Sequence, residues 1–196
     1  MVISESDARL VTAFIKAEVF QKIKKEHLQG NQTIAILCGD CIHSGDIIDH
    51  HREVCGHAPH ILALNGGSLL IPKNSPLNGA SVRGNILIED IVESVEFKGI
   101  KKIIIYAHNI CGKAHGVRLS FRDSVALHVG AKRRLKQSRL ICSRLEAQEL
   151  SIYCFHHVFF PNGDRKTFFI SPPHWDIFSQ ITEGLSDEEI CTRYEV

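Results

Sequence analysis

Three residues with metal-binding side chains follow two apolar runs of the chain. Cys38 ends the first run, and His108 and Cys111 follow the second, at residues 101–107. Thiolates and imidazoles are preferred zinc ligands, and two thiolates with one imidazole leave the fourth position of a tetrahedral site open, as in catalytic zinc sites. These residue types therefore indicate a zinc site, provided that the two runs lie side by side.

Other interpretations of the same residues stay open. Buried cysteines often act as small apolar side chains, and His108 fits equally a hydrogen-bonded core histidine. Cys38 and Cys41 form a C-x-x-C pair, typical of a structural zinc site with Cys41 as a further ligand, or of a redox motif. A structural site more often has a second such pair, and the sequence has none. Asp40 is placed either to take the fourth metal position or to hold water on the metal.

The predicted elements place these motifs at one edge of a sheet. Three apolar runs have the composition of strands buried on both faces: residues 33–38, 60–64 and 101–107. Helical spacing of apolar residues occurs between and around them: residues 6–28, 85–97 and 119–147, the last as one or two helices. Alternating strands and helices predict a parallel sheet. The carboxyl ends of its strands meet at one edge, so the three candidate ligands converge.

The second half of the chain adds a hairpin. Runs at residues 150–160 and 166–170 flank the turn sequence Pro161-Asn162-Gly163-Asp164. We predict a three-layer α/β fold with a mostly parallel central sheet, flanked by helices and extended by an antiparallel edge hairpin. The length of 196 residues fits one domain, residues 1–196, with a helical arm at 1–30 and a helical tail at 173–196.

Composition indicates which binding partners and which cellular compartment to expect. The formal net charge is +1, which gives no reason to expect nucleic-acid binding, and the basic cluster at 132–136 fits a solvated helix face. No apolar stretch reaches the ~18 residues of a membrane span, so no membrane partner is expected. The first residues are acidic and lack a secretory pattern. An odd count of seven cysteines favours a reducing, cytoplasmic setting.

The remaining histidines give weaker signals. Adjacent histidines on a strand point to opposite faces of the sheet, which does not favour a shared metal. We interpret these histidines as structural: His43 as a loop residue, His57 and His60 as packing residues, and the pairs His50-His51 and His156-His157 as surface or partly buried residues. Asn65-Gly66-Gly67 lacks the full dinucleotide-binding fingerprint and predicts no nucleotide site.

The two motifs, in this order, resemble those of the β-class carbonic anhydrases. That family has C-x-D-x-R after its first strand and H-x-x-C-G after its third; here residues 38–42 read C-G-D-C-I and residues 108–112 read H-N-I-C-G. The segment Leu64-Asn65-Gly66-Gly67 is similar to the family's R-N-A-G segment, with leucine in place of arginine. The hairpin around Asn162-Gly163 is similar to the family's edge strands. The resemblance spans roughly residues 33–172.

The resemblance implies a zinc-dependent carbonate dehydratase, a lyase that reversibly hydrates CO2 to bicarbonate by a zinc-bound hydroxide. It implies Cys38, His108 and Cys111 as zinc ligands and Asp40 as the catalytic residue that accepts a hydrogen bond from the hydroxide. A nearby histidine would carry the released proton to solvent. Family protomers usually pair, so a homodimer or a higher homo-oligomer is implied.

Ile42 stands where the family has an arginine. That arginine pairs with the aspartate and keeps it off the metal, whereas isoleucine has no side-chain donor. Arg52 and Arg83 are the candidates for supplying the guanidinium from elsewhere. Without one, Asp40 becomes the fourth ligand, and the alternative is a catalytically weak or inactive carbonic-anhydrase-like zinc protein with a binding or structural role. A third hypothesis is a small α/β binding module with buried thiols and no metal.

Overall fold

The computed structural model of the chain describes residues 2–30, 32–40, 42–79, 82–109 and 111–196. Its centre is a six-stranded sheet with the strand order β1-β6-β5-β4-β2-β3. The strands are β1 (Phe20–Gln21), β2 (Thr33–Cys38), β3 (His60–Leu64), β4 (Lys102–Asn109), β5 (Ser151–Phe159) and β6 (Arg165–Ile170). The helices are α1 (Glu5–Lys16), α2 (Ser44–Cys55), α3 (Arg83–Phe97), α4 (Gly112–Gly116), α5 (Phe121–Leu135), α6 (Arg139–Glu146), α7 (Pro172–Ile181) and α8 (Asp187–Arg193), with 3-10 turns η1 (Lys25–His27) and η2 (Gly67–Leu70).

The sheet is mixed. Strands β3, β2, β4 and β5 run parallel, whereas β6 pairs antiparallel with β5 and β1 pairs antiparallel with β6. The predicted α/β fold, with a mostly parallel central sheet and an antiparallel edge hairpin, is confirmed. Because β4 lies directly between β2 and β5, the tips of β2 and β4 are neighbours.

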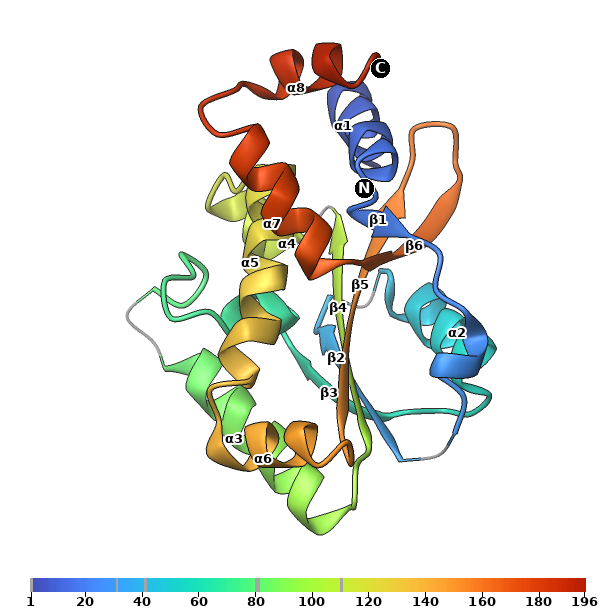
Figure 1. The fold of residues 1–196 in the computed structure, drawn as a ribbon, viewed down its shortest axis with the longest axis vertical. Coiled ribbons are helices and arrows are strands. Elements are labelled where there is room, and N and C mark those ends of the chain that lie inside the picture. Colours follow the sequence, from blue (N-terminus) through green and yellow to red (C-terminus); the bar gives the residue numbers. More distant parts are fainter. Residues whose placement is uncertain (1, 31, 41, 80–81, 110) are drawn as a thin grey trace.

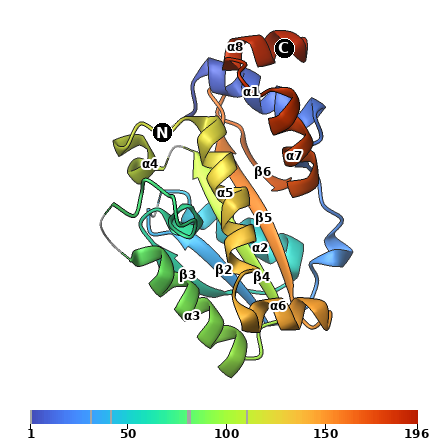
Figure 2. The same cartoon turned by 60° about the vertical axis from the view of Figure 1, so that its left-hand side comes forward.

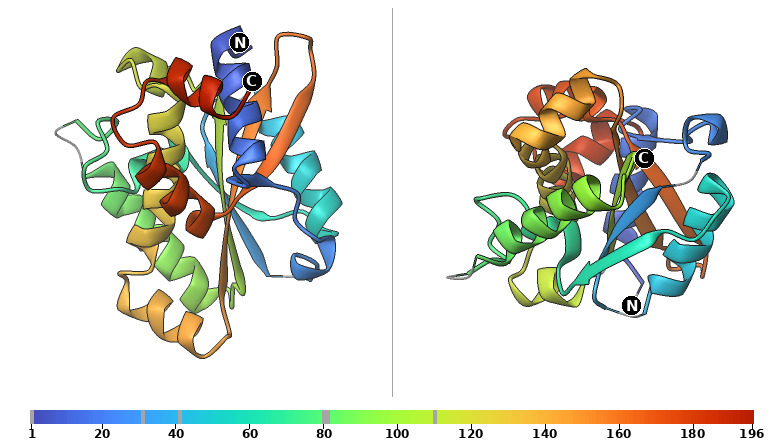
Figure 3. Two further views of the ribbon diagram at one scale, coloured as in Figure 1. Left: turned by 45° about the horizontal axis from the view of Figure 1, so that its top comes forward. Right: turned by 90° about the horizontal axis from the view of Figure 1, so that it is seen from below.

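Helices cover both faces of this sheet, which gives three layers (Figures 1 and 3). On one face, α1, α3, α5, α6 and α7 bury the larger apolar cluster with alternate strand residues such as Ile36 and Ile105. On the other face, α2 packs on the intervening residues, including Leu37 and Tyr106. Figure 2 shows α5 lying along β4 and β5, with α3 and α6 beside it. The period of two along each strand thus divides the apolar residues between two cores.

Two predicted elements differ in the structure. The predicted helix at 6–28 ends at Lys16, because Glu18 has a left-handed φ of 57° and Phe20 then pairs with Ile170 of β6. Strand β3 is not buried on both faces: it lies at the sheet edge, and Ile61 is 41% exposed. Both differences arise from strand pairing with residues that are distant in the sequence.

No helix in the described ranges combines the length and the apolar character that crossing a membrane requires. The helix α1 lies beside α8 near the C-terminus, as Figure 1 shows, and Lys16 Nζ donates to the carbonyl of Tyr194 at 2.9 Å.

Histidines contribute to the core more than the sequence predicts. His156 and His157 are both buried, because helices and loops cover both faces of β5 and adjacent residues point to opposite faces. His51 is also buried, although on helix α2 rather than on a strand. Placing these three at the surface or only partly inside is therefore wrong, whereas His50 is half-buried. Burial lowers the pKa of His51 to about 4 and that of His128 to about 3, so both are neutral in the folded protein.

Because these histidines are neutral in the folded protein, we expect its free energy of unfolding to fall in acid. Their pKa values are depressed on folding, so the unfolded chain binds more protons below its ordinary value of 6.5. Stability should be full above pH 6.5 and should fall between pH 6.5 and about 4, by up to about 1.4 kcal/mol per pH unit for each histidine. Urea unfolding of metal-free protein at several pH values measures this slope. His128→Gln should make the slope smaller, because it removes one of these histidines, and His115→Gln, on the surface, should not; a flat profile in the unaltered protein contradicts the prediction.

Candidate metal centre

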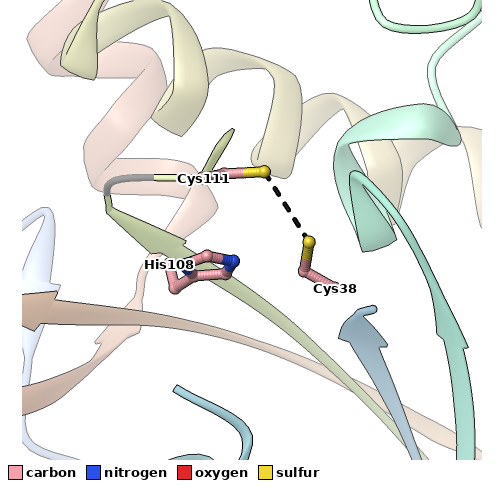
Figure 4. Close-up of side chains that lie close together, drawn as sticks. All are labelled: Cys38, His108 and Cys111. Carbon is pink, nitrogen blue, oxygen red and sulfur yellow. Dashed lines mark hydrogen bonds between the residues drawn. The ribbon is translucent and has the colours of Figure 1, made fainter. Parts of the chain in front are cut away.

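Cys38, His108 and Cys111 lie together at the carboxyl end of the sheet (Figure 4). Cys38 is the last residue of β2, His108 lies near the end of β4, and Cys111 directly precedes α4. All three are buried, with exposed fractions of 8%, 3% and 3%. Their potential ligand atoms lie within 4.8 Å of one another, and the two sulfurs are 3.7 Å apart. The strand order thus brings the three candidate ligands to one point.

The distances and the unpaired atoms fit a zinc ion. Zn–S bonds of 2.3 Å in a tetrahedral site place two sulfurs about 3.8 Å apart, close to the 3.7 Å between Cys38 and Cys111. Both ring nitrogens of His108 are buried and have no hydrogen-bond partner among the described residues. A buried polar atom left unpaired costs free energy that a metal bond would recover. The three side chains can therefore hold zinc and leave a fourth position open.

The two thiols are electrostatically distinct. The hydrogen bond between the sulfurs raises the pKa of Cys38 and lowers that of Cys111, because one sulfur keeps the proton and donates it to the other. The backbone N–H of Gly66 also donates to Cys38 Sγ at 3.2 Å, and backbone N–H groups of Lys113 and Ala114 favour the Cys111 thiolate. These hydrogen bonds therefore stabilise a negatively charged thiolate in the Cys38–Cys111 pair.

The Asn65-Gly66-Gly67 segment supports the end of β2. Gly67 has a left-handed φ of 50°, and a Cβ there would lie 2.7 Å from the backbone nitrogen of Cys38. Only glycine allows both this conformation and this close approach. The segment therefore fixes the backbone that carries the first thiol, a structural role that differs from nucleotide binding.

A pocket of about 400 Å³ opens beside Cys38. Its lining residues are Cys38, Asp40, Asn65, Arg83, Gly112 and Lys113. Arg83, the first residue of α3, therefore shares this pocket with Asp40, whereas Arg52 pairs with Asp49 on α2. Ile42 is 61% exposed, and its backbone N–H donates to Asp40 Oδ1 at 3.2 Å. Cys41 lies outside the described residues, so the C-x-x-C alternative stays a hypothesis.

A second group of possible ligands was missed from the sequence. The described residues contain only one other set of three histidine, cysteine or acidic side chains with ligand atoms this close: His43, Asp46 and His157. His43 lies in the turn before α2, as a loop residue, but it is buried. The spacing H-x-x-D at 43–46 at the start of a helix was the available signal, because residues three apart share a helix face. His157, 111 residues further along the chain than Asp46, gives no local signal.

The comparisons with known proteins add a distant likeness. No protein-family model matches the chain, and no curated protein sequence matches it either. Among solved structures it is similar to the β-carbonic anhydrase CcaA, with 15% identity and a TM-score of 0.46 over 74% of this chain and 86% of that one. It is also similar to β-carbonic anhydrase isoform I of the protozoan Trichomonas vaginalis (14%, 0.47, 86% and 99%) and to CafA of the fungus Aspergillus fumigatus (12%, 0.44, 85% and 82%). At such identities and TM-scores, the likeness is one of fold alone.

The geometry of the centre predicts thiolate-dependent zinc binding. Purified protein should carry zinc, and Cys111→Ser should lose at least tenfold in affinity because a serine hydroxyl is a poor zinc ligand at neutral pH. Elemental analysis after dialysis measures the zinc content. The matched control is Cys142→Ser, the same change at a half-buried thiol on α6, which should leave zinc content unchanged. Equal zinc loss in both variants, or none in either, contradicts the assignment.

Proposed function

We propose that the protein is a zinc-dependent carbonic anhydrase, a carbonate dehydratase that reversibly hydrates CO2 to bicarbonate. The observation that carries the proposal is the cluster of Cys38, His108 and Cys111, together with a pocket that Cys38 and Asp40 both line. Three protein ligands with an open fourth position is the usual plan of a catalytic zinc site. The order and spacing of the two motifs, which resemble those of the β-class enzymes, add independent support.

Zinc, when bound, lowers the pKa of water to about 7 and so makes hydroxide available at neutral pH. Asp40 would orient this nucleophile by accepting its hydrogen bond. One carboxylate oxygen of Asp40 already accepts the backbone N–H of Ile42, while the other lies next to Gly112, 3.8 Å from where a Cβ would be. The absence of a side chain on Gly112 keeps this side of the carboxylate open to a small reactant.

Arg83 supplies the positive charge that position 42 lacks. It lies in the same pocket as Asp40, and a guanidinium there favours a carboxylate held away from the metal. The side chain of Asn65, also in the wall of the pocket, offers an amide to the oxygens of CO2 or bicarbonate. In this proposal a residue on α3 takes the role that the family gives to a residue just after the first strand.

The alternative is a zinc protein of weak or no activity, with Asp40 as the fourth ligand. Its support is electrostatic: the negative charge of Asp40 raises the pKa of the Cys111 thiol, against the larger lowering effect of the hydrogen bond from Cys38. If Arg83 did not restrain it, this carboxylate would close the open position and exclude water.

We further propose a homodimer or higher homo-oligomer in a reducing, cytoplasmic setting, with CO2 and bicarbonate as the small-molecule partners. Two strongly exposed apolar side chains lie close in sequence to residues of the pocket: Val82 precedes Arg83 and is 63% exposed, and Ile42, two residues after Asp40, is 61% exposed. In this proposal they lie in the interface between protomers. The described cysteines are all free thiols, which is compatible with a reducing environment.

The substitution Asp40→Asn distinguishes the active enzyme from the weak or inactive zinc protein, because activity falls in one case and rises in the other. If Asp40 orients the nucleophile, the variant should lose on the order of a hundredfold in kcat. If Asp40 instead blocks the metal, the variant should gain activity over an inactive parent. Stopped-flow CO2 hydration with a pH indicator, on zinc-loaded protein, measures both. The control Asp49→Asn makes the same charge change on the exposed side of α2 and should be neutral. No hydration above buffer by the unaltered protein at any pH from 6 to 9 would exclude the enzymatic proposal.

The substitution Arg83→Gln tests the source of the missing guanidinium. Without this charge, Asp40 should move toward the metal, so hydration activity should fall at least tenfold while zinc content stays constant. Arg83→Lys should recover part of the loss, because it restores the charge without the planar fork. Arg52→Gln is the matched control, since Arg52 pairs with Asp49 instead. Equal activities of the Arg83→Gln and Arg52→Gln variants would show that Arg83 has no such role.

A further inference from the structure

We propose that His43, Asp46 and His157 form a second metal site, specific for a divalent first-row transition ion such as zinc. His43 directly precedes α2, Asp46 lies in the first turn of that helix, and His157 comes from β5. The site is separate from the thiolate centre: it shares none of its ligands and opens into a different pocket. It rests on two independent features, ligand spacing and unpaired nitrogens, and a surface pocket gives access to it.

The spacing leaves room for an ion and not for a hydrogen bond. His157 Nε2 lies 3.7 Å from Asp46 Oδ2, beyond the usual range for an N–H···O bond. Two ligands at zinc–nitrogen and zinc–oxygen distances in a tetrahedral site lie about 3.3 Å apart. All three ligand atoms are within 4.8 Å of one another, so small side-chain rotations complete the site.

Each of the two histidines has an unpaired ring nitrogen. His43 Nε2 and His157 Nε2 are both buried, and neither has a hydrogen-bond partner among the described residues. Both side chains are about 2% exposed, so water does not readily replace the missing partner.

Neighbouring groups orient two of the ligands. His157 Nδ1 lies 2.9 Å from Thr167 Oγ1, and donation from Nδ1–H to this oxygen selects the tautomer whose Nε2 lone pair faces the site. Arg165 Nη1 lies 3.0 Å from both carboxylate oxygens of Asp46 and holds this side chain in place. Such outer partners are typical of protein metal sites, in which ligating histidines and carboxylates are themselves hydrogen-bonded.

An ion can reach the site from solvent. A surface pocket of about 380 Å³ has Asp46 and His157 in its wall, together with Asp49, His50, Glu53, Arg165 and Thr167. Each of the three carboxylates around this entrance pairs with a cation: Asp46 with Arg165, Asp49 with Arg52 and Glu53 with Lys25. These pairs leave no net charge at the entrance, and the ligand set has a single negative charge, so this site is weaker than the thiolate centre, which therefore fills first.

The ligand set selects the class of ion. Two imidazoles and one carboxylate suit zinc, cobalt, nickel, copper and iron, whereas magnesium and calcium prefer oxygen ligands alone. The ring of His43 lies 4.9 Å from that of His108 and 5.4 Å from that of His157, so the two proposed sites are neighbours. An experiment must therefore distinguish them by ligand chemistry and not by stoichiometry alone.

Cobalt(II) titration of the metal-free full-length protein distinguishes the two sites. The first equivalent should produce a thiolate-to-cobalt charge-transfer band, because only the first centre has sulfur ligands. A second equivalent should bind more weakly and add only d–d absorption, because its ligands are nitrogen and oxygen. X-ray absorption of Cys38→Ser/Cys111→Ser protein with one equivalent should then show imidazole scattering without sulfur.

Substitutions of the proposed ligands test where the second equivalent of cobalt(II) binds. Asp46→Asn and His157→Gln should each weaken it at least tenfold while keeping the thiolate band, which also reports that the variant is folded. Asp49→Asn, the same charge change in the same pocket, should keep both equivalents. Retention of the second equivalent in Asp46→Asn and His157→Gln, or its absence from the unaltered protein, would overturn the proposal. If the unaltered protein binds cobalt without a thiolate band, that result counts against the zinc centre of the proposed enzyme and leaves this second site standing.

Discussion

The parallel pairing of β2 with β4 is the constraint on which the site depends. Its register places Thr33 opposite Lys102 and Ile36 opposite Ile105, so the end of β2 lies beside the last residues of β4. Cys38 is the last residue of one strand, and His108 lies near the end of the other. A shift of one residue would turn every side chain of a strand to the opposite face and would also expose its apolar residues. The burial of the isoleucines in two cores therefore fixes the positions of the ligands.

The next pairing in the sheet explains why the two candidate sites are neighbours. In the β4–β5 register His108 lies opposite His157, and paired residues of parallel strands point to the same face. That face is the one covered by α2, because Tyr106 and Phe155, two positions earlier on each strand, both pack in the core beneath this helix. The residue that precedes α2 is His43, whose ring lies next to both other rings. One helix and two strands thus bring three histidines together at the sheet edge.

The sequence predicted those parts of the structure that depend on local patterns. Apolar runs located the three strands, and Pro161-Asn162-Gly163-Asp164 located the hairpin. Tertiary pairing decided the rest: α1 ends where Phe20 joins the sheet, and His157 becomes a partner of His43 only through β5. For the missing guanidinium the sequence left Arg52 and Arg83 as equal candidates. Only the fold places Arg83 in the pocket with Asp40, because α3 begins at that edge of the sheet.

Unpaired buried nitrogens do not by themselves indicate a metal. His128 Nε2 and His156 Nδ1 are also buried without partners among the described residues. His156, however, lies among the rings of Phe20, Phe121 and His128, on the face of the sheet opposite His157. Neither belongs to a set of three close ligands in the described part of the chain. Anionic ligands help to offset a divalent ion's loss of hydration. Thiolates at one place and Asp46 at the other supply that charge, and this separates the two candidate centres from the other buried histidines.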